Sequence, residues 1–222
     1  MKKILCIGDS LALPREGCDY EDTWFFLLKT MYPRNEFIPF FERGLRITKV
    51  DQMFDVYYNY YKPDIVIIQC GVCDCSPRII NDLSLHWRII IKLVGFCKLE
   101  SIFWRIIKRL FRRKAECVYT NPDQFCKCYK SIVDRFILSS VERIVIVKIG
   151  HSSDSILKSS PSFNNNVDAY NKIIDEAFGQ EEKVIIVNPL DRVYDNFFLD
   201  GYHCSPKGMN IVYNTLVNLK IF

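Results

Sequence analysis

The chain has 222 residues, of which 49% are hydrophobic and 25% charged, and its formal net charge is +4. This composition is typical of a folded globular protein, and it excludes disordered and fibrous chains. No apolar stretch reaches the roughly 18 residues that a membrane-spanning helix requires, and the run after Lys3 is too short for a secretory signal. The length suits one hydrophobic core, so we expect a single domain over residues 1–222.

Short apolar runs rich in β-branched residues predict the strands. These runs are Lys3–Ile7, Asp64–Cys70, Arg143–Ile149 and Lys183–Val187, and Phe37–Phe41 is a weaker fifth candidate. They are nearly continuous rather than alternating, which is typical of parallel strands covered on both faces.

Helix-like stretches lie between these runs: Tyr20–Met31, Thr48–Tyr61, Pro122–Ser139, Asn166–Phe178 and Pro206–Leu219. The alternation of strands and helices predicts an α/β fold, a three-layer α/β/α sandwich with a mainly parallel sheet. Ligands of such sheets bind at the carboxyl ends of the strands. We therefore expect the site where Ser10, a Gly71–Asp74 loop and His151 follow strands.

The segment 79–114 interrupts this alternation as a basic helical insertion. Residues 86–114 hold nine Lys or Arg against one acid, Glu100, a balance of +8 that leaves −4 for the remainder. Apolar residues lie among them at helical spacing, and we expect Gly95 to divide the segment into two amphipathic helices. The hairpin either packs on the domain or binds an anionic membrane surface or a protein partner. No recognised nucleic-acid module accompanies the charge, so no nucleic-acid partner is expected.

Ten cysteines occur without the spacing of a disulfide framework. This usage favours a reducing, cytoplasmic setting, with the inner face of a membrane as a peripheral site. The clusters Cys70-x-x-Cys73-x-Cys75 and Cys126-x-Cys128 lack the two well-spaced pairs typical of zinc sites, so we expect no metal.

Two short motifs near opposite ends of the chain carry the chemistry. Ser10 lies in Gly8-Asp9-Ser10-Leu11, and Asp200 and His203 bound Asp200-Gly201-Tyr202-His203. A serine hydroxyl becomes a nucleophile when a base takes its proton, and a carboxylate holds that base in the required tautomer. Ser10, His203 and Asp200 are therefore candidates for nucleophile, base and orienting group. A turn serine and a surface histidine are the structural alternatives.

These motifs and their order resemble the SGNH/GDSL hydrolase family. Gly44 in Glu42-Arg43-Gly44-Leu45 matches the second block of that family, and Gly71-Val72-Cys73-Asp74 matches the third, normally Gly-x-Asn-Asp. The resemblance implies an SGNH-hydrolase/flavodoxin-like fold and an oxyanion hole built from the Ser10 and Gly44 amides and an Asn side chain. Cys73 occupies that Asn position, and a thiol is a poor hydrogen-bond donor. No cofactor is implied.

The run from Gly71 to Arg78 is similar to a branch of the family that reads Gly-Ile-Val-Asp-Cys-Ala-Pro-Arg and accompanies surface-polysaccharide biosynthesis. The resemblance implies an acylated sugar or glycolipid as the substrate. Asp74, Arg78 and His151 are candidates for substrate binding. A salt bridge for Arg78 and an ordinary loop position for His151 are the alternatives.

The sequence thus predicts a serine esterase or O-acyltransferase that acts on an acyl ester, in particular an acetyl ester, of a carbohydrate or glycolipid. The alternative is a weakly active or inactive binding protein on the same scaffold, docked on a membrane or a partner through the basic insertion.

Overall fold

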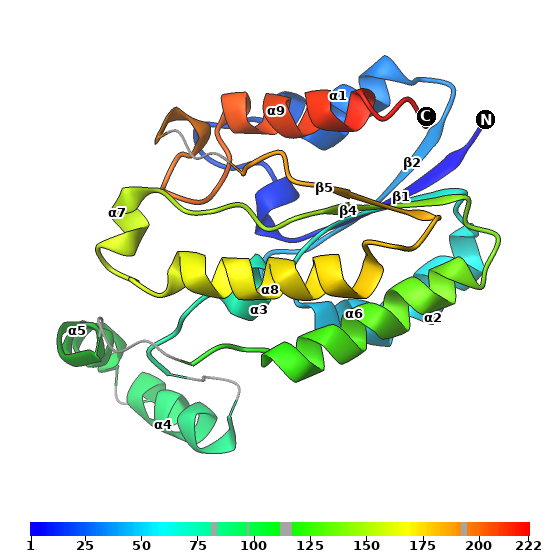
Figure 1. Ribbon diagram of the computed structural model, residues 1–222. Coiled ribbons are helices and arrows are strands. Elements are labelled where there is room, and N and C mark those ends of the chain that lie inside the picture. The colour runs from blue at the N-terminus through cyan, green and yellow to red at the C-terminus, as the bar shows by residue number, and fades with distance from the viewer. Residues whose placement is uncertain (81–83, 97, 112–116, 192–194) are drawn as a thin grey trace.

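Five parallel strands form one sheet in the order β2-β1-β3-β4-β5 (Figure 1). The computed structural model describes residues 1–80, 84–96, 98–111, 117–191 and 195–222. The strands are β1 (Lys3–Gly8), β2 (Glu36–Phe41), β3 (Ile65–Gln69), β4 (Arg143–Val147) and β5 (Val184–Val187). All five predicted strands are present, including the weaker candidate Phe37–Phe41, which corresponds to β2.

Helices cover both faces of this sheet. On one face lie α1 (Trp24–Met31) and α9 (Pro206–Val217), and on the other lie α2 (Ile47–Tyr61), α6 (Pro122–Ile137) and α8 (Phe163–Phe178) (Figure 1). The predicted three-layer α/β/α architecture with a parallel sheet is therefore confirmed.

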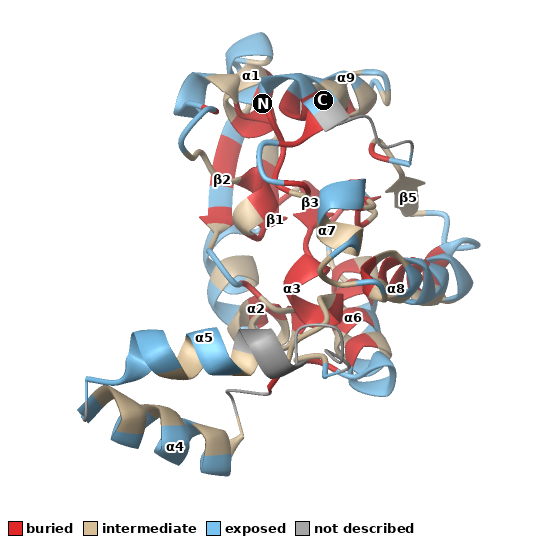
Figure 2. Cartoon of the chain, turned by 90° about the vertical axis from the view of Figure 1, so that its left-hand side faces the viewer, coloured by how far each residue is buried: buried red, intermediate tan, exposed pale blue. Residues whose placement is uncertain are grey.

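The continuous apolar strands supply two separate cores. Successive side chains of a strand point to opposite faces, so Ile4 and Cys6 of β1 pack with Trp24 of α1, whereas Leu5 and Ile7 pack with the core of the opposite face. Every residue of β3 is buried. Figure 2, seen from the carboxyl ends of the strands, shows this buried centre between helices whose outer surfaces are exposed.

The start of the first predicted helix differs because of a local hydrogen bond, and a predicted loop is helical. The predicted helix Tyr20–Met31 begins with a 3-10 turn, Tyr20–Asp22, and α1 starts only at Trp24 because the Thr23 hydroxyl caps the Phe26 amide at 3.3 Å. The predicted Gly71–Asp74 loop is instead a single helical turn, α3 (Val72–Cys75), and another short turn, α7 (Asp154–Leu157), follows β4.

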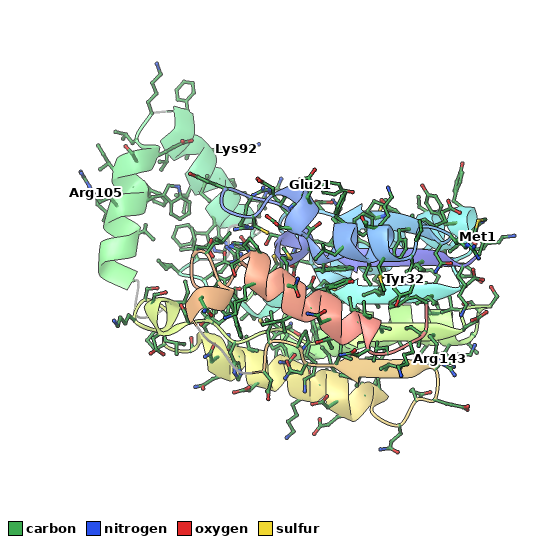
Figure 3. All side chains as sticks on the ribbon, turned by 90° about the horizontal axis from the view of Figure 1, so that it is seen from above. Met1, Glu21, Tyr32, Lys92, Arg105 and Arg143 are labelled. Atoms are coloured by element: carbon green, nitrogen blue, oxygen red, sulfur yellow. The ribbon has the colours of Figure 1, made fainter. Side chains whose placement is uncertain are left out.

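The basic segment forms two neighbouring helices, α4 (Leu85–Phe96) and α5 (Glu100–Phe111), which project from the body near the carboxyl ends of the strands (Figures 1 and 3). The prediction that Gly95 separates them is wrong. Gly95 lies inside α4, where the Glu100 carboxylate approaches it closely, and the chain turns after Phe96, with Lys98 at a φ of 55°.

Part of the predicted insertion, including Arg112, Arg113 and Lys114, lies outside the described residues. None of the helices in the described part of the chain combines the length and the apolar character needed to cross a bilayer.

Candidate active site

The loop after β1 presents Ser10 in a tight turn. Asp9 is the N-cap of the 3-10 turn Ser10–Ala12, and its Oδ1 accepts a hydrogen bond from the Leu11 amide at 2.9 Å. A Cβ on Gly8 would come within 2.7 Å of the Ala12 Cβ, so a side chain at this position would push the turn away from β1. Gly8 and Asp9 together fix the backbone that carries the Ser10 hydroxyl.

Asp9 is fully buried, and burial raises the pKa of its carboxyl to about 7, with a further contribution from the charge of Asp74. A carboxyl group with this pKa is partly protonated at neutral pH. Because Asp9 caps the Ser10–Ala12 turn, its contribution to the site is to hold the backbone of that turn in place.

Ser10, His203 and Asp200 form one hydrogen-bonded chain. The Ser10 Oγ lies 3.1 Å from the His203 Nε2, and the His203 Nδ1 lies 2.7 Å from the Asp200 Oδ2. The other Asp200 oxygen accepts the His203 backbone amide at 3.0 Å. These distances suit a serine that gives its proton to an imidazole oriented by a carboxylate.

The turn that carries Asp200 and His203 is closed by an isolated antiparallel bridge between Phe198 and Cys204. Immediately after it, Ser205 caps α9 by accepting the Gly208 amide at 3.3 Å. The bridge and the cap hold the turn from both ends, so His203, itself buried, is supported by backbone hydrogen bonds rather than by a mobile loop.

Burial lowers the pKa of the His203 imidazole, although its hydrogen bond to Asp200 acts in the opposite direction. Burial alone would raise the pKa of Asp200, but hydrogen bonds from His203 outweigh it and the pKa is lowered. At neutral pH the pair is therefore a neutral imidazole beside a carboxylate, which is the protonation state of a general base.

Gly44 and Cys73 follow the two strands on either side of β1. Gly44 has a φ of +76°, a conformation that favours glycine. Cys73 lies in α3 and is 8% exposed. Burial raises the pKa of its thiol to about 12, while the nearby Gly44 amide acts to lower it. Cys73 therefore carries a protonated thiol beside the Gly44 amide at neutral pH.

Asp74 and His151 make their contacts away from the Ser10–His203–Asp200 hydrogen bonds. Asp74 is completely buried, and its carboxylate accepts the Ile47 amide at 3.1 Å and the Thr120 hydroxyl at 2.5 Å, which anchors the start of α2. His151 Nε2 lies 2.6 Å from Asp168 Oδ1, in a cavity of about 190 Å³ that neither Ser10 nor His203 lines.

Arg78 stacks on an aromatic ring, its guanidinium carbon 3.9 Å from the centre of the Tyr119 ring.

Sequence reasoning missed two neighbours of the hydrogen-bonded chain. Arg15 donates to Asp200 Oδ2 at 3.3 Å and to the Ser10 carbonyl at 3.2 Å, and the Tyr202 ring lies 4.0 Å from the His203 ring, centre to centre. The available signal was the position of Arg15 in the loop that carries Ser10.

No protein-family model and no curated protein matches the sequence. Solved structures do match over nearly the whole chain. The lipase/acylhydrolase from Enterococcus faecalis is 16% identical, covers 99% of this chain and 95% of its own, and has a TM-score of 0.67. The structure of TesA is 15% identical, with coverages of 98% and 97% and a TM-score of 0.65. The chain has the SGNH/GDSL hydrolase fold.

The acetyl xylan esterase AlAXEase is also similar in structure. It is 13% identical to the chain, covers 99% of it and 100% of its own length, and has a TM-score of 0.60. At such low identities the similarity establishes the fold, and the chemistry of this chain must be argued from its own residues.

Proposed function

We propose that the protein is a serine esterase or O-acyltransferase that uses Ser10, His203 and Asp200. The observation that carries this proposal is the Ser10 Oγ to His203 Nε2 to Asp200 chain, with distances of 3.1 and 2.7 Å. Two segments far apart in the sequence, the Ser10 loop and the Asp200–His203 turn, meet there, at the carboxyl edge of the sheet, where parallel α/β folds bind ligands.

In the proposed reaction, the Ser10 Oγ attacks the ester carbonyl while its proton passes to His203 Nε2. The ester C–O bond then breaks, and His203 returns the proton to the departing alcohol. An acyl group remains on Ser10. Water or a second hydroxyl, deprotonated by His203, takes this acyl group and regenerates the serine. Asp200 stabilises the imidazolium both when Ser10 is acylated and when the acyl group leaves it, and no external oxidant or reductant is needed.

The backbone amides of Ser10 and Gly44 are the proposed donors to the oxyanion. Within the described residues the Ser10 amide has no hydrogen-bond acceptor, which leaves it available. Cys73 occupies the third position, and its thiol is a weak donor. The proposed enzyme therefore lacks one strong donor at this position.

We propose an acetyl ester of a carbohydrate or glycolipid as the substrate. Two similarities support this: one of the structural relatives is an acetyl xylan esterase, and the run from Gly71 to Arg78 resembles a family branch linked to polysaccharide biosynthesis. Hydrolase and acyltransferase differ only in whether water or a sugar hydroxyl reaches the acyl group on Ser10.

The test is hydrolysis of p-nitrophenyl acetate by wild type and by Ser10→Ala, with Ser101→Ala on the exposed face of α5 as a matched control. We expect Ser10→Ala to abolish turnover and Ser101→Ala to retain it. A fluorophosphonate should label wild type at Ser10, and labelling should disappear in Ser10→Ala. Equal turnover in the two variants would contradict the proposal.

A second candidate function is favoured by Cys73. With a thiol where the family has a strong donor, the fold would serve as an inactive or weakly active binding protein. Failure of the folded wild-type protein to react with the fluorophosphonate, together with no turnover, would favour this candidate over the esterase.

We further propose that α4 and α5 bind an anionic lipid surface, at the cytoplasmic face of a membrane. Large apolar side chains are exposed on both helices, among them Leu93 and Phe96, the latter 89% exposed. Exposed basic residues such as Lys92 and Arg105 accompany them (Figure 3). Apolar and basic side chains on one helical hairpin favour binding at an anionic interface.

Sedimentation with vesicles tests this docking. Wild type should sediment with phosphatidylglycerol vesicles but not with phosphatidylcholine vesicles, and Phe96→Ser should weaken sedimentation. Leu138→Ser is the matched control, because Leu138 is equally exposed (87%) but lies at the end of α6. Equal sedimentation of both variants would exclude the hairpin as the lipid-binding element.

A further inference from the structure

Arginines lie on the three loops that carry Ser10, Gly44 and Cys73. Arg15 follows Ser10 in the loop after β1, Arg43 and Arg46 flank Gly44 in the loop after β2, and Arg78 follows α3 after β3. Because the strands are parallel and adjacent, these loops meet at one edge of the sheet.

The first two arginines are held close to the nucleophile by backbone carbonyls. Arg15 donates to the Ser10 carbonyl at 3.2 Å and to Asp200 at 3.3 Å. Arg43 donates to the carbonyl of Pro14 at 3.2 Å, the residue before Arg15. Both guanidinium groups are thereby fixed against the loop that carries Ser10.

The other two arginines share one aromatic ring. The guanidinium carbon of Arg78 lies 3.9 Å and that of Arg46 lies 5.6 Å from the centre of the Tyr119 ring. The Nε of Arg78 is buried and has no hydrogen-bond partner within the described residues. A buried N–H without a partner costs free energy unless a ligand or water accepts it. The guanidinium of Arg78 is therefore held against Tyr119, and its Nε has no acceptor among the described residues.

The carboxylates in the described part of the chain neutralise this cluster only in part. Among the residues that the structure describes, Arg15 pairs with Asp200, whereas Arg43, Arg46 and Arg78 have no acidic partner within salt-bridge distance. The neighbouring Glu42 is already bound to Lys49 at 2.6 Å.

Two buried carboxyl groups, Asp9 and Asp74, lie at the same edge and offset only part of the charge of the arginines. Burial raises the pKa of Asp9 to about 7 and that of Asp74 to about 6. Near neutral pH Asp9 is partly protonated, whereas Asp74 is mostly ionised and interacts with the charge of Arg46. The carboxylate of Asp74 offsets one of the three charges of Arg43, Arg46 and Arg78, so the cluster keeps an excess of positive charge.

The positive charge of the arginine cluster acts on His203 and on Tyr202 beside it. Burial lowers the pKa of His203, and the charges of Arg15 and Arg43 lower it further. Burial raises the pKa of Tyr202, whose ring covers His203, and the charges of Arg15 and Arg78 oppose that rise. The cluster and the Ser10–His203 pair therefore share one electrostatic environment.

We propose that the site takes an ester whose alcohol part carries a phosphate or carboxylate group, bound by the guanidinium fork of Arg78 with Arg46 and Arg43 beside it. Guanidinium groups bind both anions through paired N–H donors. The anion neutralises the excess positive charge of the cluster. This inference rests on the proposed esterase function, since it names the substrate class of the same site.

Three acetyl esters test the inference: phenyl acetate, 4-acetoxybenzoate and 4-acetoxyphenyl phosphate. For each, kcat/KM is divided by the rate constant for hydrolysis by hydroxide, which removes differences in chemical reactivity. We expect the ratio to be higher by roughly 10- to 100-fold for an anionic ester, the range expected for a hydrogen bond between charged groups. The carboxylate and phosphate esters show which anion is preferred.

Arg78→Gln should remove most of this preference, and Arg78→Lys, which keeps the charge but loses the fork, should restore part of it. Arg143→Gln is the matched control, because Arg143 is exposed at the opposite end of the sheet (Figure 3), where its guanidinium donates to the carbonyl of Glu142 at 2.9 Å. It should leave the preference intact. Equal losses for neutral and anionic esters in Arg78→Gln would overturn the inference.

Binding of phenyl phosphate to the Ser10→Ala protein, measured by calorimetry, separates the two proposals. Binding that Arg78→Gln weakens at least about 10-fold, without ester turnover in wild type, supports the anion site and contradicts the esterase. Turnover of phenyl acetate by wild type, with no anion preference and no binding of phenyl phosphate, supports the esterase and overturns the anion site.

Discussion

Replacing Cys73 by Asn tests whether the missing oxyanion donor limits the rate of the proposed reaction. Cys73 is 8% exposed, and burial holds its thiol pKa at about 12. The thiol therefore contributes neither a thiolate nor a strong donor at neutral pH. An Asn amide at this position would place an N–H group next to the Gly44 amide.

Removal of one oxyanion donor costs about 10²–10³ in turnover, or roughly 3–4 kcal/mol. Restoring a donor in a site that did not evolve around it should recover part of that range, so we expect kcat to rise about 10- to 100-fold. Asn is larger than Cys, and overpacking of a buried position costs about 1–3 kcal/mol of stability. The gain should therefore appear in kcat, accompanied by a lower unfolding midpoint.

Steady-state hydrolysis of p-nitrophenyl acetate measures the effect, with Cys73→Ala and Cys73→Ser as controls. Ala removes the thiol without adding a donor, and Ser supplies a hydroxyl of similar size to the thiol. We expect the order of kcat to be Asn, then Ser, then wild type and Ala. If folded Cys73→Asn is no faster than Cys73→Ala, the reasoning about the third donor is refuted.

Three further predictions concern the charged groups of the site. Asp200→Asn should lower kcat by about 10⁴-fold, because the imidazole loses the carboxylate that fixes its tautomer, and p-nitrophenyl acetate turnover measures this. Arg43→Gln should move the acid limb of kcat/KM to higher pH, because the positive charge of Arg43 lowers the pKa of His203; Arg143→Gln should leave the limb in place. Asp9→Asn should flatten the pH dependence of stability in urea unfolding. The folded-state pKa of Asp9, about 7, lies above its ordinary 3.8, so its stabilisation is complete below pH 4 and is lost as the pH rises to 7. A steeper fall for Asp9→Asn between pH 5 and pH 8 would contradict that sign.

The strands were predictable because the chemistry of each one is uniform. A run such as Ile65–Gln69 is buried on both faces, and its apolar residues leave no other interpretation. Helix boundaries were less predictable because single hydrogen bonds set them. The Thr23 cap shortens α1, and the chain turns after Phe96 rather than at Gly95. Neither event changes the hydrophobic pattern from which the helices were predicted.

The meeting of Ser10 with His203 followed from the order of motifs along parallel strands, and the two side chains lie within hydrogen-bond distance. Their catalytic roles stay predictions. The contacts of Asp74 and Arg15 could not be read from the sequence. The Gly71–Asp74 motif gives no sign that its carboxylate will be buried against Ile47 and Thr120. The position of Arg15 in the Ser10 loop places it near the site but does not identify Asp200 as its partner.

The hairpin of α4 and α5 leaves and rejoins the body at one point. The Arg78 amide donates to the Cys117 carbonyl at 2.7 Å, and the Cys117 amide donates back at 3.2 Å, so the two ends of the segment already touch. An insertion whose two ends are adjacent can be lengthened, exchanged or lost while the sheet keeps its connectivity. Related chains can therefore acquire new attachment surfaces here without rebuilding their interior, and Arg78, at the junction, links any such change to the neighbouring arginine cluster.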